Sequence, residues 1–577
     1  MRTSFILLAS FLILFFASVA FAQMPYDAGD WTSYRDFRYA VAVDAGSHEV
    51  FVATSGGILE YNLYRQKWYD PMTVGYGLSV AIQFDAPIAL LFDEQTSYVW
   101  VATRTQLLQY DVNLEQWQVV SRNLWGPGDR VINIGVGGND VYVETVPGAL
   151  FSNSFLPGSP IPTTNWLGYV TRYKGSRTGG GLILSVEQNL PDGIRWRGFR
   201  SKVPLRTEEL YGRLGSGVAN LPSILLPAGW IWNSDGTILD PYLRAAQFTD
   251  WIVDGFGHFW GTYWGAGVLI DDLRGGRAEF YQAGPAGNDV RAILVNRDDV
   301  WMGGANSGDR LGISHASADL KDWQSFETRM NSRIRSTTLF DIANWDGDTW
   351  FATDDGLLVY HSKDESWKSY GLNQHLQSDR VLSLAASDSE LWIGTEDGLS
   401  VMTRPGRDIF RMADAGPIIT DITHLALCGD TLYVGTQLGL YEGRAKDRRF
   451  AYSTLDPTIV SSSVTDIAVL QTQVWITTSS GIVTYDQSTG TQKSFLLTWL
   501  GGKPPTTIYP GNHFVWVGTG NGLYRYKRET GEWISYTTTD GMIDNRVEVV
   551  QGDGDDLLIG TPAGLTRFYW NRPDRAR

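Results

Sequence analysis

The phrase VWVGTGNGLYRY, residues 515–526, joins a short apolar run to a Gly-Thr pair, a turn and an alternating tail. Nearly the same phrase recurs as FVATSGGILEY (51–61), WFATDDGLLVY (350–360), WIGTEDGLSVM (392–402), YVGTQLGLYEG (433–443) and WITTSSGIVTY (475–485). Such a recurrence indicates a repeat architecture, in which each unit is one supersecondary element that packs on its neighbours.

The first aromatic residue of each phrase gives the period of the repeat. From Trp350 to Trp516 the equivalent positions follow each other at steps of 41 or 42 residues. Further equivalents are Phe51, Trp100, Tyr142, Trp260, Trp301 and Leu558. A period of about 40–45 residues is typical of four-stranded propeller blades. The strands that carry the aromatic residue are apolar at nearly every position, as expected of strands covered on both faces. The sequence therefore predicts an all-β fold of β-propeller blades.

The number of units predicts two rings. Eleven units are clear, and two degenerate ones are expected around Trp230 and in residues 180–188. One ring usually holds four to eight blades. We therefore predict two consecutive β-propellers of four-stranded blades. Residues 23–283 would form about six blades, irregular over 155–243, and residues 284–577 would form seven. Two rings of six blades, divided near Trp323, are the alternative.

The two ends of the chain suggest how the rings close. The phrase DWTSY, residues 30–34, resembles the outer strand of a blade with nothing before it, whereas the last unit lacks its outer strand. Pairing of such ends would leave no open sheet edge. We expect residues 31–34 to close the first ring and AEFYQ, residues 278–282, to close the second.

The N-terminus has the pattern of a secretory signal peptide over residues 1–22. Arg2 precedes an apolar run at residues 5–19, and Ala20-Phe21-Ala22 forms a small-residue cleavage site. A membrane anchor is the alternative, but the run is shorter than a typical span. We expect an exported protein with no transmembrane span after cleavage of this signal.

Charge and cysteine content narrow the compartment and the partners. The net charge of −16 argues against nucleic acid and against an anionic membrane surface. The single cysteine, Cys428, forms no internal disulfide and lies in an apolar run, where we expect a buried, inert thiol. A large exported protein without disulfides fits a bacterial envelope. The expected location is therefore periplasmic or secreted.

The repeated phrase, aromatic-apolar-Gly-Thr-x-x-Gly-Leu followed by Tyr and a closing Trp or Phe, resembles the two-component regulator propeller repeat. The resemblance covers most of the chain, best over residues 299–577. It implies an exported, sensor-like β-propeller, since tandem propellers of this family form the periplasmic part of hybrid histidine kinases and often recognise breakdown products of polysaccharides. The chain ends at Arg577 without a kinase part, so we expect no signal transduction by this chain alone. It also resembles the PorZ-type accessory components of type IX secretion, although no C-terminal sorting domain is visible.

The repeat itself offers little chemistry. Aromatic residues that recur at one position in every unit indicate packing between blades rather than sugar stacking. The acidic stretches 346–348 and 553–556 lack the ligand spacing of a calcium loop and are typical of turns. The seven histidines are scattered, and no nucleophile motif or phosphate loop is evident. We therefore predict no catalytic residues, no metal and no cofactor.

Residues 155–243 break the repeat and contain IRWRGFRSKVPLR, residues 194–206, in an otherwise acidic protein. A segment that departs from a repeat is free to carry a site. We predict that Arg197 and Arg200 clamp a carboxylate or an acidic sugar, with Trp196 as a stacking face. Trp230 and Trp232 complete the predicted ligand-binding residues. The alternative is a divergent blade whose arginines face solvent.

The preferred hypothesis is a non-enzymatic, sensor-like binding protein that recognises a carbohydrate, another small ligand or an envelope protein. The second hypothesis is a polysaccharide-degrading lyase or hydrolase, which requires catalytic groups to converge at one channel mouth. The third is an accessory factor of envelope secretion or assembly, which requires a stable protein partner.

Overall fold

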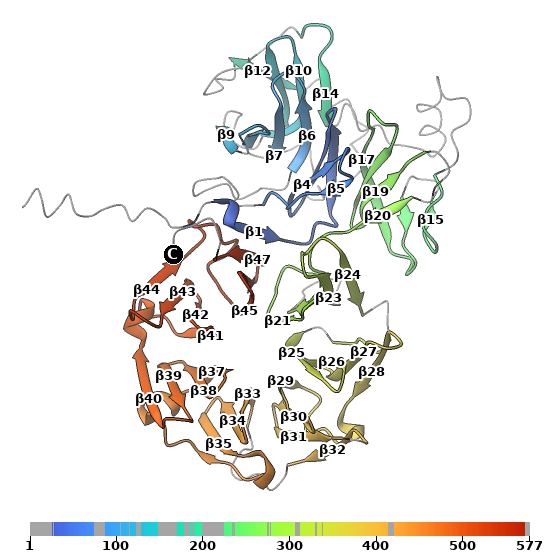
Figure 1. The fold of residues 1–577 in the computed structure, drawn as a ribbon. Coiled ribbons are helices and arrows are strands. Elements are labelled where there is room, and N and C mark those ends of the chain that lie inside the picture. Colours follow the sequence, from blue (N-terminus) through green and yellow to red (C-terminus); the bar gives the residue numbers. More distant parts are fainter. Residues whose placement is uncertain are drawn as a thin grey trace, which may run out of the picture.

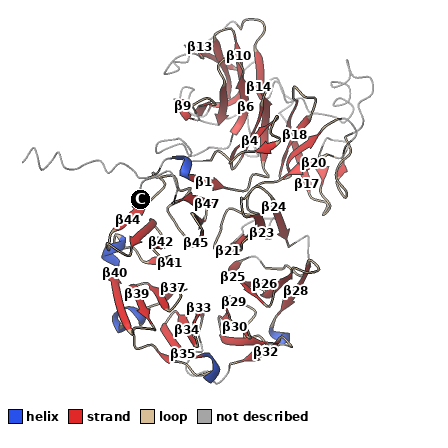
Figure 2. Ribbon diagram, viewed as in Figure 1, coloured by secondary structure: helices blue, strands red, loops and turns tan. Residues whose placement is uncertain are grey.

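The computed structural model describes residues 26, 28–73, 87–103, 106–114, 116–122, 129–147, 170–177, 185–186, 190–198, 224–233, 237–273, 276, 278–305, 312–328, 332–336, 338–404, 406–412 and 420–571. These residues form a ring of small sheets below and a second group of sheets above it (Figure 1). Strands make up nearly all of the regular structure, and the helices are short turns between them (Figure 2). The predicted all-β propeller fold is confirmed. The predicted signal peptide and Arg200 lie outside the described residues.

In the part of the chain that the structure describes, seven four-stranded sheets form the C-terminal ring (Figure 1). Its first three sheets are β21 (Ala292–Val295), β22 (Asp299–Gly303), β23 (Gly312–Ser317) and β24 (Trp323–Glu327); β25 (Leu339–Trp345), β26 (Asp348–Thr353), β27 (Gly356–His361) and β28 (Ser366–Tyr370); and β29 (Val381–Ala386), β30 (Glu390–Thr395), β31 (Gly398–Thr403) and β32 (Asp408–Arg411).

The next three sheets are β33 (Ile422–Cys428), β34 (Thr431–Thr436), β35 (Gly439–Arg444) and β36 (Ala451–Tyr452); β37 (Val464–Leu470), β38 (Gln473–Thr478), β39 (Gly481–Asp486) and β40 (Thr491–Leu496); and β41 (Pro505–Pro510), β42 (Phe514–Thr519), β43 (Gly522–Lys527) and β44 (Trp533–Tyr536). The seventh joins β45 (Val549–Asp553), β46 (Asp556–Thr561) and β47 (Gly564–Tyr569) to β1 (Trp31–Tyr34). Short helices are η1 (Ala28–Asp30), η4 (Leu372–Gln374), η5 (Ala445–Asp447), α3 (Pro457–Val460) and η6 (Leu497–Leu500).

The repeated phrase has a direct structural cause in each sheet. Trp516 is buried in the second strand and packs toward the next sheet. The hydroxyl of Thr519 donates to the carbonyl oxygen of Gly522 at 2.9 Å and closes the turn into the third strand. Gly522 has φ +126°, and a Cβ there would lie 2.5 Å from the carbonyl oxygen of Tyr536 in the fourth strand. The interpretation of the repeated aromatic residues as packing is confirmed.

The closure of the C-terminal ring differs from the prediction. Strand β1 pairs antiparallel with β47, with Trp31 opposite Phe568. These two aromatic side chains stack with centroids 3.7 Å apart, and the hydroxyl groups of Ser33 and Thr566 form a 2.9 Å hydrogen bond. The expectation that residues 31–34 close the first ring is wrong, because their aromatic partner is in the last sheet. The expectation for residues 278–282 is also wrong: β20 (Glu279–Tyr281) pairs with β19 (Gly267–Asp271) in its own sheet.

The N-terminal part forms four sheets within the described ranges, which we call the N-terminal sheets. Their strands are β2 (Ala40–Ala45), β3 (Glu49–Thr54), β4 (Gly57–Asn62) and β5 (Lys67–Trp68); β6 (Pro87–Asp93), β7 (Tyr98–Thr103), β8 (Gln106–Asp111) and β9 (Gln116–Arg122); β10 (Asp129–Gly137), β11 (Asp140–Pro147), β12 (Thr171–Ser176), β13 (Ser185–Val186) and β14 (Arg195–Gly198); and β15 (Ile231–Trp232), β16 (Ile238–Leu239), β17 (Ala245–Val253), β18 (Phe259–Trp264), β19 and β20.

Both segments that were expected to mark degenerate blades join neighbouring sheets instead. Strand β13, in the segment 180–188, pairs with β12, and the hairpin β15–β16 extends the sheet of β17 to β20. As far as their residues are described, both segments thus extend sheets that other strands form. The number of blades in each ring stays a prediction, as does the domain boundary at residue 283.

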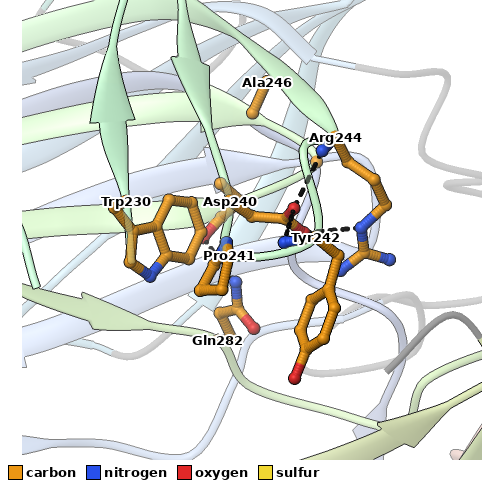
Figure 3. A pocket seen from close by; sticks show the side chains of 9 residues that line it. Trp230, Asp240, Pro241, Tyr242, Arg244, Ala246 and Gln282 are labelled. Atoms are coloured by element: carbon orange, nitrogen blue, oxygen red, sulfur yellow. Dashed lines mark hydrogen bonds and ion pairs between the residues drawn. The ribbon is translucent and has the colours of Figure 1, made fainter. Parts of the chain in front are cut away.

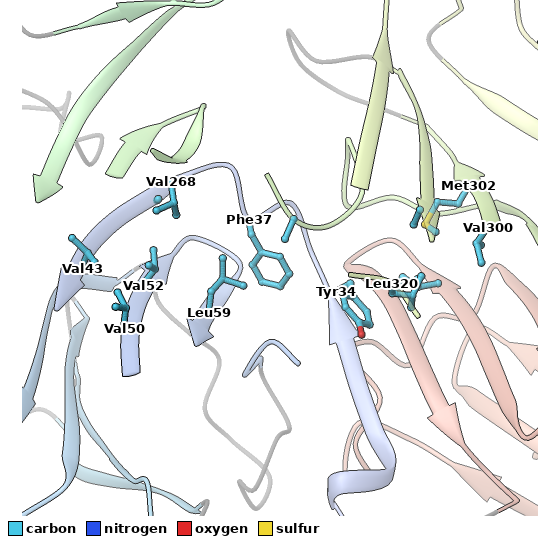
Figure 4. Close-up of a cluster of buried hydrophobic side chains, with 14 of the residues drawn as sticks. Tyr34, Phe37, Val43, Val50, Val52, Leu59, Val268, Val300, Met302 and Leu320 are labelled. Carbon is cyan, nitrogen blue, oxygen red and sulfur yellow. The ribbon is translucent and has the colours of Figure 1, made fainter. Parts of the chain in front are cut away.

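A continuous hydrophobic cluster connects the N-terminal sheets to the C-terminal ring. Val43 and Val268 of the N-terminal sheets belong to the same buried cluster as Val300 and Met302 of the C-terminal ring, and Phe37 lies between the two groups (Figure 4). Burial of apolar surface is the main favourable term in such contacts. The two parts therefore share one core at their junction.

A buried ion network lies at the same junction. Arg38, between β1 and β2, binds Asp36 and Glu327 with nitrogen–oxygen distances of 2.7 Å to each. Arg244 of the N-terminal sheets contacts the same Glu327, which ends β24 of the C-terminal ring, and also Asp240. Burial alone would lower the pKa of Arg38, but the two carboxylates outweigh it and raise that pKa. We call these five residues the junction ion network.

Aspartates on three innermost strands tie their sheets to a neighbouring sheet. Each lies at a β-bulge of its strand, and its carboxylate accepts a backbone N–H from the innermost strand of the neighbouring sheet. The donor–acceptor pairs are Val43 to Asp250 (3.2 Å), Leu384 to Asp341 (2.8 Å) and Ile508 to Asp466 (2.8 Å). The bulge thus turns a carboxylate toward a donor that the sheet itself does not satisfy.

Replacing Asp341 by asparagine is expected to change how stability depends on pH. Burial raises the pKa of Asp341, against the opposing effects of the Leu384 N–H and of His424. A raised folded-state pKa means that the native protein binds the proton more tightly than the unfolded chain. Stability is therefore lost as pH rises from about 4 through the raised pKa. The asparagine side chain of the variant cannot ionise, so Asp341→Asn should gain stability relative to the parent across that window.

Urea denaturation at a series of pH values from 4 to 8 measures this difference. A difference between variant and parent that stays constant over the series would contradict the assignment of the raised pKa to Asp341.

Candidate functional sites

The predicted site residues Trp196 and Arg197 lie on β14, which occupies an unusual position. In the five-stranded sheet the order is β13-β12-β11-β10-β14, so β14 pairs with the inner side of the innermost strand β10. Its side chains thereby reach the innermost strands of two other sheets. Arg195 contacts the carbonyl oxygen of Phe92 on β6, and both Arg195 and Arg197 bind Asp44 on β2. Strand β14 therefore connects the innermost strands of three N-terminal sheets.

The guanidinium of Arg197 is engaged within the protein. It donates to Oδ1 of Asp44 at 2.6 and 3.0 Å, while Oδ2 of the same carboxylate accepts from Arg195 and from the Phe92 N–H, both at 2.8 Å. Burial alone would lower the pKa of Arg197, but Asp44 and Asp250 outweigh it and raise that pKa. Arg197 binds a carboxylate, which is the chemical group that was predicted for its ligand. This carboxylate, however, belongs to the protein. A role of Trp196 and Arg197 in ligand binding stays a prediction.

Trp230 and Trp232 lie on or beside β15, in a different sheet from β14. Trp230 stacks on Phe280 with centroids 3.9 Å apart and lines a hollow of about 180 Å³ beside Arg244 and Asp240 (Figure 3). Figure 3 shows the Arg244 side chain turned toward Asp240, to which its Nε donates at 2.5 Å. Ligand pockets usually have about 300–1,000 Å³. This hollow is smaller, and Asp240 and Arg244 of the junction ion network line it. A role of Trp230 and Trp232 in ligand binding stays a prediction.

A larger hollow of about 500 Å³ lies between the first two sheets of the C-terminal ring, β21–β24 and β25–β28. It opens on the side of the turns that lead into the second strands, and we call it the ring hollow. Its lining is mostly polar and aromatic. The lining residues are Asn296, Asp299, Trp301, His315, Asn344, Gly347, Thr349, Tyr360 and Ser362.

A hydrogen-bonded chain crosses the floor of the ring hollow. Asp299 accepts from Asn296 at 2.5 Å through Oδ1 and contacts Nε2 of His315 at 2.9 Å through Oδ2. The His315 ring lies on the indole of Trp301, with centroids 4.3 Å apart. Asn344 of the second sheet donates to Asn296 of the first at 2.5 Å. The arrangement fixes one carboxylate, two amides and an imidazole at one opening.

Two carboxylates act on the wall of the ring hollow. Burial raises the pKa of Tyr360 in its wall, and the nearby carboxylates Glu365 and Asp299 raise it further. A negative potential disfavours the phenolate and favours a bound cation. The chemistry of the ring hollow therefore suits a polar ligand that carries positive charge.

Other sheets of the C-terminal ring fill the equivalent place with an arginine. In each case the arginine comes from the turn between the third and fourth strands of the following sheet. It contacts a side-chain oxygen on the first residue of a second strand and lies over the tryptophan two residues later. These inter-sheet arginine contacts are Arg407 with Asp348 and Trp350, Arg448 with Glu390 and Trp392, and Arg528 with Gln473 and Trp475.

The first sheet retains the acceptor and the tryptophan, but the second sheet, which follows it, supplies no arginine. Asp299 and Trp301 occupy the equivalent positions on β22, whereas the corresponding turn of the second sheet, residues 362–365, reads Ser-Lys-Asp-Glu and is exposed. Ser362 lines the ring hollow instead. At the hollow, His315 of the first sheet takes the place of the arginine, because it binds Asp299 and lies on Trp301.

Reasoning from the sequence missed the ring hollow. Its residues belong to well-formed units, whereas the site was predicted in the irregular segment, residues 155–243. An alignment of the units on their tryptophans would have shown the repeated acceptor at Asp299, Asp348, Glu390 and Gln473. The same alignment shows that residues 362–365 carry no arginine. The acceptor without a matching arginine was therefore the feature of the sequence that could have indicated the hollow.

The described residues hold little that indicates metal or thiol chemistry. Within them, no group of three or more His, Cys, Asp or Glu side chains is placed to hold a metal ion. The acidic turn at residues 346–348 uses Asp346 and Asp348 to bind Arg407. Cys428 is buried, as predicted, and burial raises the pKa of its thiol. No helix of the described ranges is long and apolar enough to cross a membrane.

Fold and site together define a β-propeller protein with a polar hollow between two blades. No family model matches the chain, and no curated protein does. Among solved structures it is similar to PorZ, an essential bacterial surface component of the type-IX secretion system of Porphyromonas gingivalis. The identity is 12%, the TM-score is 0.55, and the match covers 94% of this chain and 87% of PorZ.

Two extracellular domains from B. thetaiotaomicron are also similar in structure. The extracellular domain of the hybrid two-component system BT4673 matches at 13% identity and TM-score 0.46, covering 93% of this chain and 71% of that domain. The corresponding domain of BT3049 matches at 16% and 0.42, covering 93% and 82%. At such identities the likeness to PorZ shows the fold alone.

Proposed function

We propose that this protein is an exported, non-enzymatic binding protein of the bacterial envelope and that the ring hollow is its binding site. The observation that carries the proposal is the size and lining of the hollow. Its volume of about 500 Å³ lies within the range of ligand pockets, and its polar groups converge on one opening. Export is supported by the signal-peptide pattern of residues 1–22 and by the likeness to PorZ, which is a bacterial surface component.

A role as an accessory component of envelope secretion or assembly is the second candidate. It is favoured by the structural likeness to PorZ over nearly the whole chain, since PorZ is a surface component of a secretion system. In that case the ring hollow would receive a group of a protein partner rather than a soluble ligand.

Thermal unfolding of the purified protein against a panel of oligosaccharides, uronic acids, peptidoglycan fragments and short peptides tests the proposal. A ligand at 100 times its Kd should add about 2.7 kcal/mol to the stability of the native state, a shift of a few degrees in Tm. The shift should disappear in Ser362→Trp, which fills the ring hollow from its exposed rim. It should persist in Thr489→Trp, an equally exposed position on a turn of the fifth sheet.

Three other results would change the conclusion. A ligand-induced shift that survives in Ser362→Trp would place the binding site elsewhere. Loss of an added sugar over hours would favour a polysaccharide-degrading enzyme. If no compound shifts Tm, co-purification from envelope extracts tests for a protein partner, and an absent partner would refute the binding function.

A further inference from the structure

The ring hollow contains the same acceptor and tryptophan that bind an arginine of the chain at three other interfaces of the C-terminal ring. At those three interfaces the guanidinium lies over a tryptophan, at 5.4, 6.0 and 5.9 Å from the ring centroid. It also binds a side-chain oxygen two residues before that tryptophan, as in the 2.7 Å contact of Arg407 with Asp348. Stacking on an aromatic face together with a paired oxygen is the preferred environment of a guanidinium.

Asp299 and Trp301 repeat this pair of groups, and His315 binds both of them in place of an arginine. Asp348 binds His361 and Arg407 at once, so a carboxylate that holds a histidine can also take a guanidinium. From this we propose that the ring hollow binds the guanidinium group of an arginine supplied from outside, as an arginine residue in a peptide segment or as the free amino acid. The inference rests on the proposed function and names the chemistry of the ligand. The carboxylates of Glu365 and Asp299, which act on Tyr360 in the same wall, also favour a cation there.

The groups at the ring hollow match the donors of a guanidinium. Its five N–H groups are all donors and need acceptors. The carboxylate of Asp299 supplies charge, and the side-chain oxygen atoms of Asn344 and Thr349 lie in the same lining. His315 covers the indole of Trp301, so the entering group would stack on the exposed part of the imidazole or on Tyr360 rather than on the indole itself.

Saturation-transfer-difference NMR with the full protein tests the inference directly. The probes are N-acetyl-Gly-Arg-Gly-amide, its Gln counterpart and free L-arginine. The Arg peptide should give a saturable signal, and the Gln peptide should bind at least tenfold more weakly because it lacks the charged planar fork. A stronger signal from free arginine than from the Arg peptide would identify the amino acid as the source of the guanidinium and would also support the inference.

Two variants of the ring hollow and one control locate the binding. Asp299→Asn keeps the shape of the side chain and removes its charge, so affinity for the Arg peptide should fall at least tenfold. Ser362→Arg supplies the missing arginine from the chain, so the signal should be lost and Tm should rise. Thr489→Arg adds the same charge on an exposed turn of another sheet and should leave binding unchanged.

Equal binding of the Gln and Arg peptides would overturn the inference. If that binding is still lost in Ser362→Arg, the ring hollow remains a binding site and the proposed function stands. No signal from the Arg peptide or from free arginine at 10-fold higher concentration than the other panel ligands would also overturn it, whatever the sugar panel shows. Binding that persists in Ser362→Arg would place the guanidinium elsewhere and equally refute the assignment.

Discussion

Replacing Trp31 by alanine is expected to lower the free energy of unfolding by about 3–5 kcal/mol. The indole is 2% exposed, stacks on Phe568 and lies beside Tyr536. Its strand β1 is also the fourth strand of the seventh sheet, so the loss weakens the closure of the whole ring as well as leaving a cavity. Urea denaturation followed by circular dichroism measures the change.

Trp499→Ala is the matched control for this prediction. Its indole is 55% exposed in η6, so truncation should change stability by no more than about 0.5 kcal/mol. A loss of the same small size in Trp31→Ala would contradict the role of β1 in closing the ring. A further expected consequence of weakened closure is aggregation, because the edge of β47 becomes available for pairing with another chain.

Replacing Arg38 by methionine is expected to cost about 3–5 kcal/mol, because it leaves buried carboxylates without their partner. Glu327 would keep its contact with Arg244, whereas Asp36 would lose the guanidinium to which it is bound. Since these residues join the N-terminal sheets to the C-terminal ring, we also expect the two parts to unfold separately. Scanning calorimetry should show one transition in the parent and two in the variant.

Arg546→Met serves as the control for the junction ion network. Arg546 also pairs with a carboxylate, that of Glu548 at 2.6 Å, but its side chain is 60% exposed. Such surface pairs contribute about 0–1 kcal/mol. If both variants lose equally little, and calorimetry shows a single transition in each, the network does not couple the two parts of the molecule.

The sheets were predictable because their determinants are local. A Trp, a Thr and a Gly within eight residues decide the burial of the second strand, the hydrogen bond of the turn and the approach of the fourth strand. The partner of an unpaired outer strand is a different problem. Trp31 offers the same aromatic face to either ring, and the preference for Phe568 depends on a residue at the far end of the chain. Periodicity carries no information about that choice.

The candidate site was predictable only in its chemistry. The basic run at residues 194–206 correctly suggested an arginine that binds a carboxylate. Its partner Asp44 lies in another sheet, so the sequence could not distinguish an internal partner from a ligand. The ring hollow depends on the absence of a residue. It lies beside Ser362, in a turn that lacks the arginine found in the corresponding turns of three other sheets.

The pairing of β1 with β47 has a consequence for the order in which the molecule assembles. The two strands meet across 533 positions of sequence, as the bond between Ser33 and Thr566 shows. The N-terminal sheets are therefore an insertion between the closing strand of the C-terminal ring and its first sheet. During synthesis the N-terminal sheets can fold first, whereas the C-terminal ring stays open until its last strand, β47, has emerged. A fragment that begins at residue 284 would contain every strand of that ring except β1, the strand that closes it.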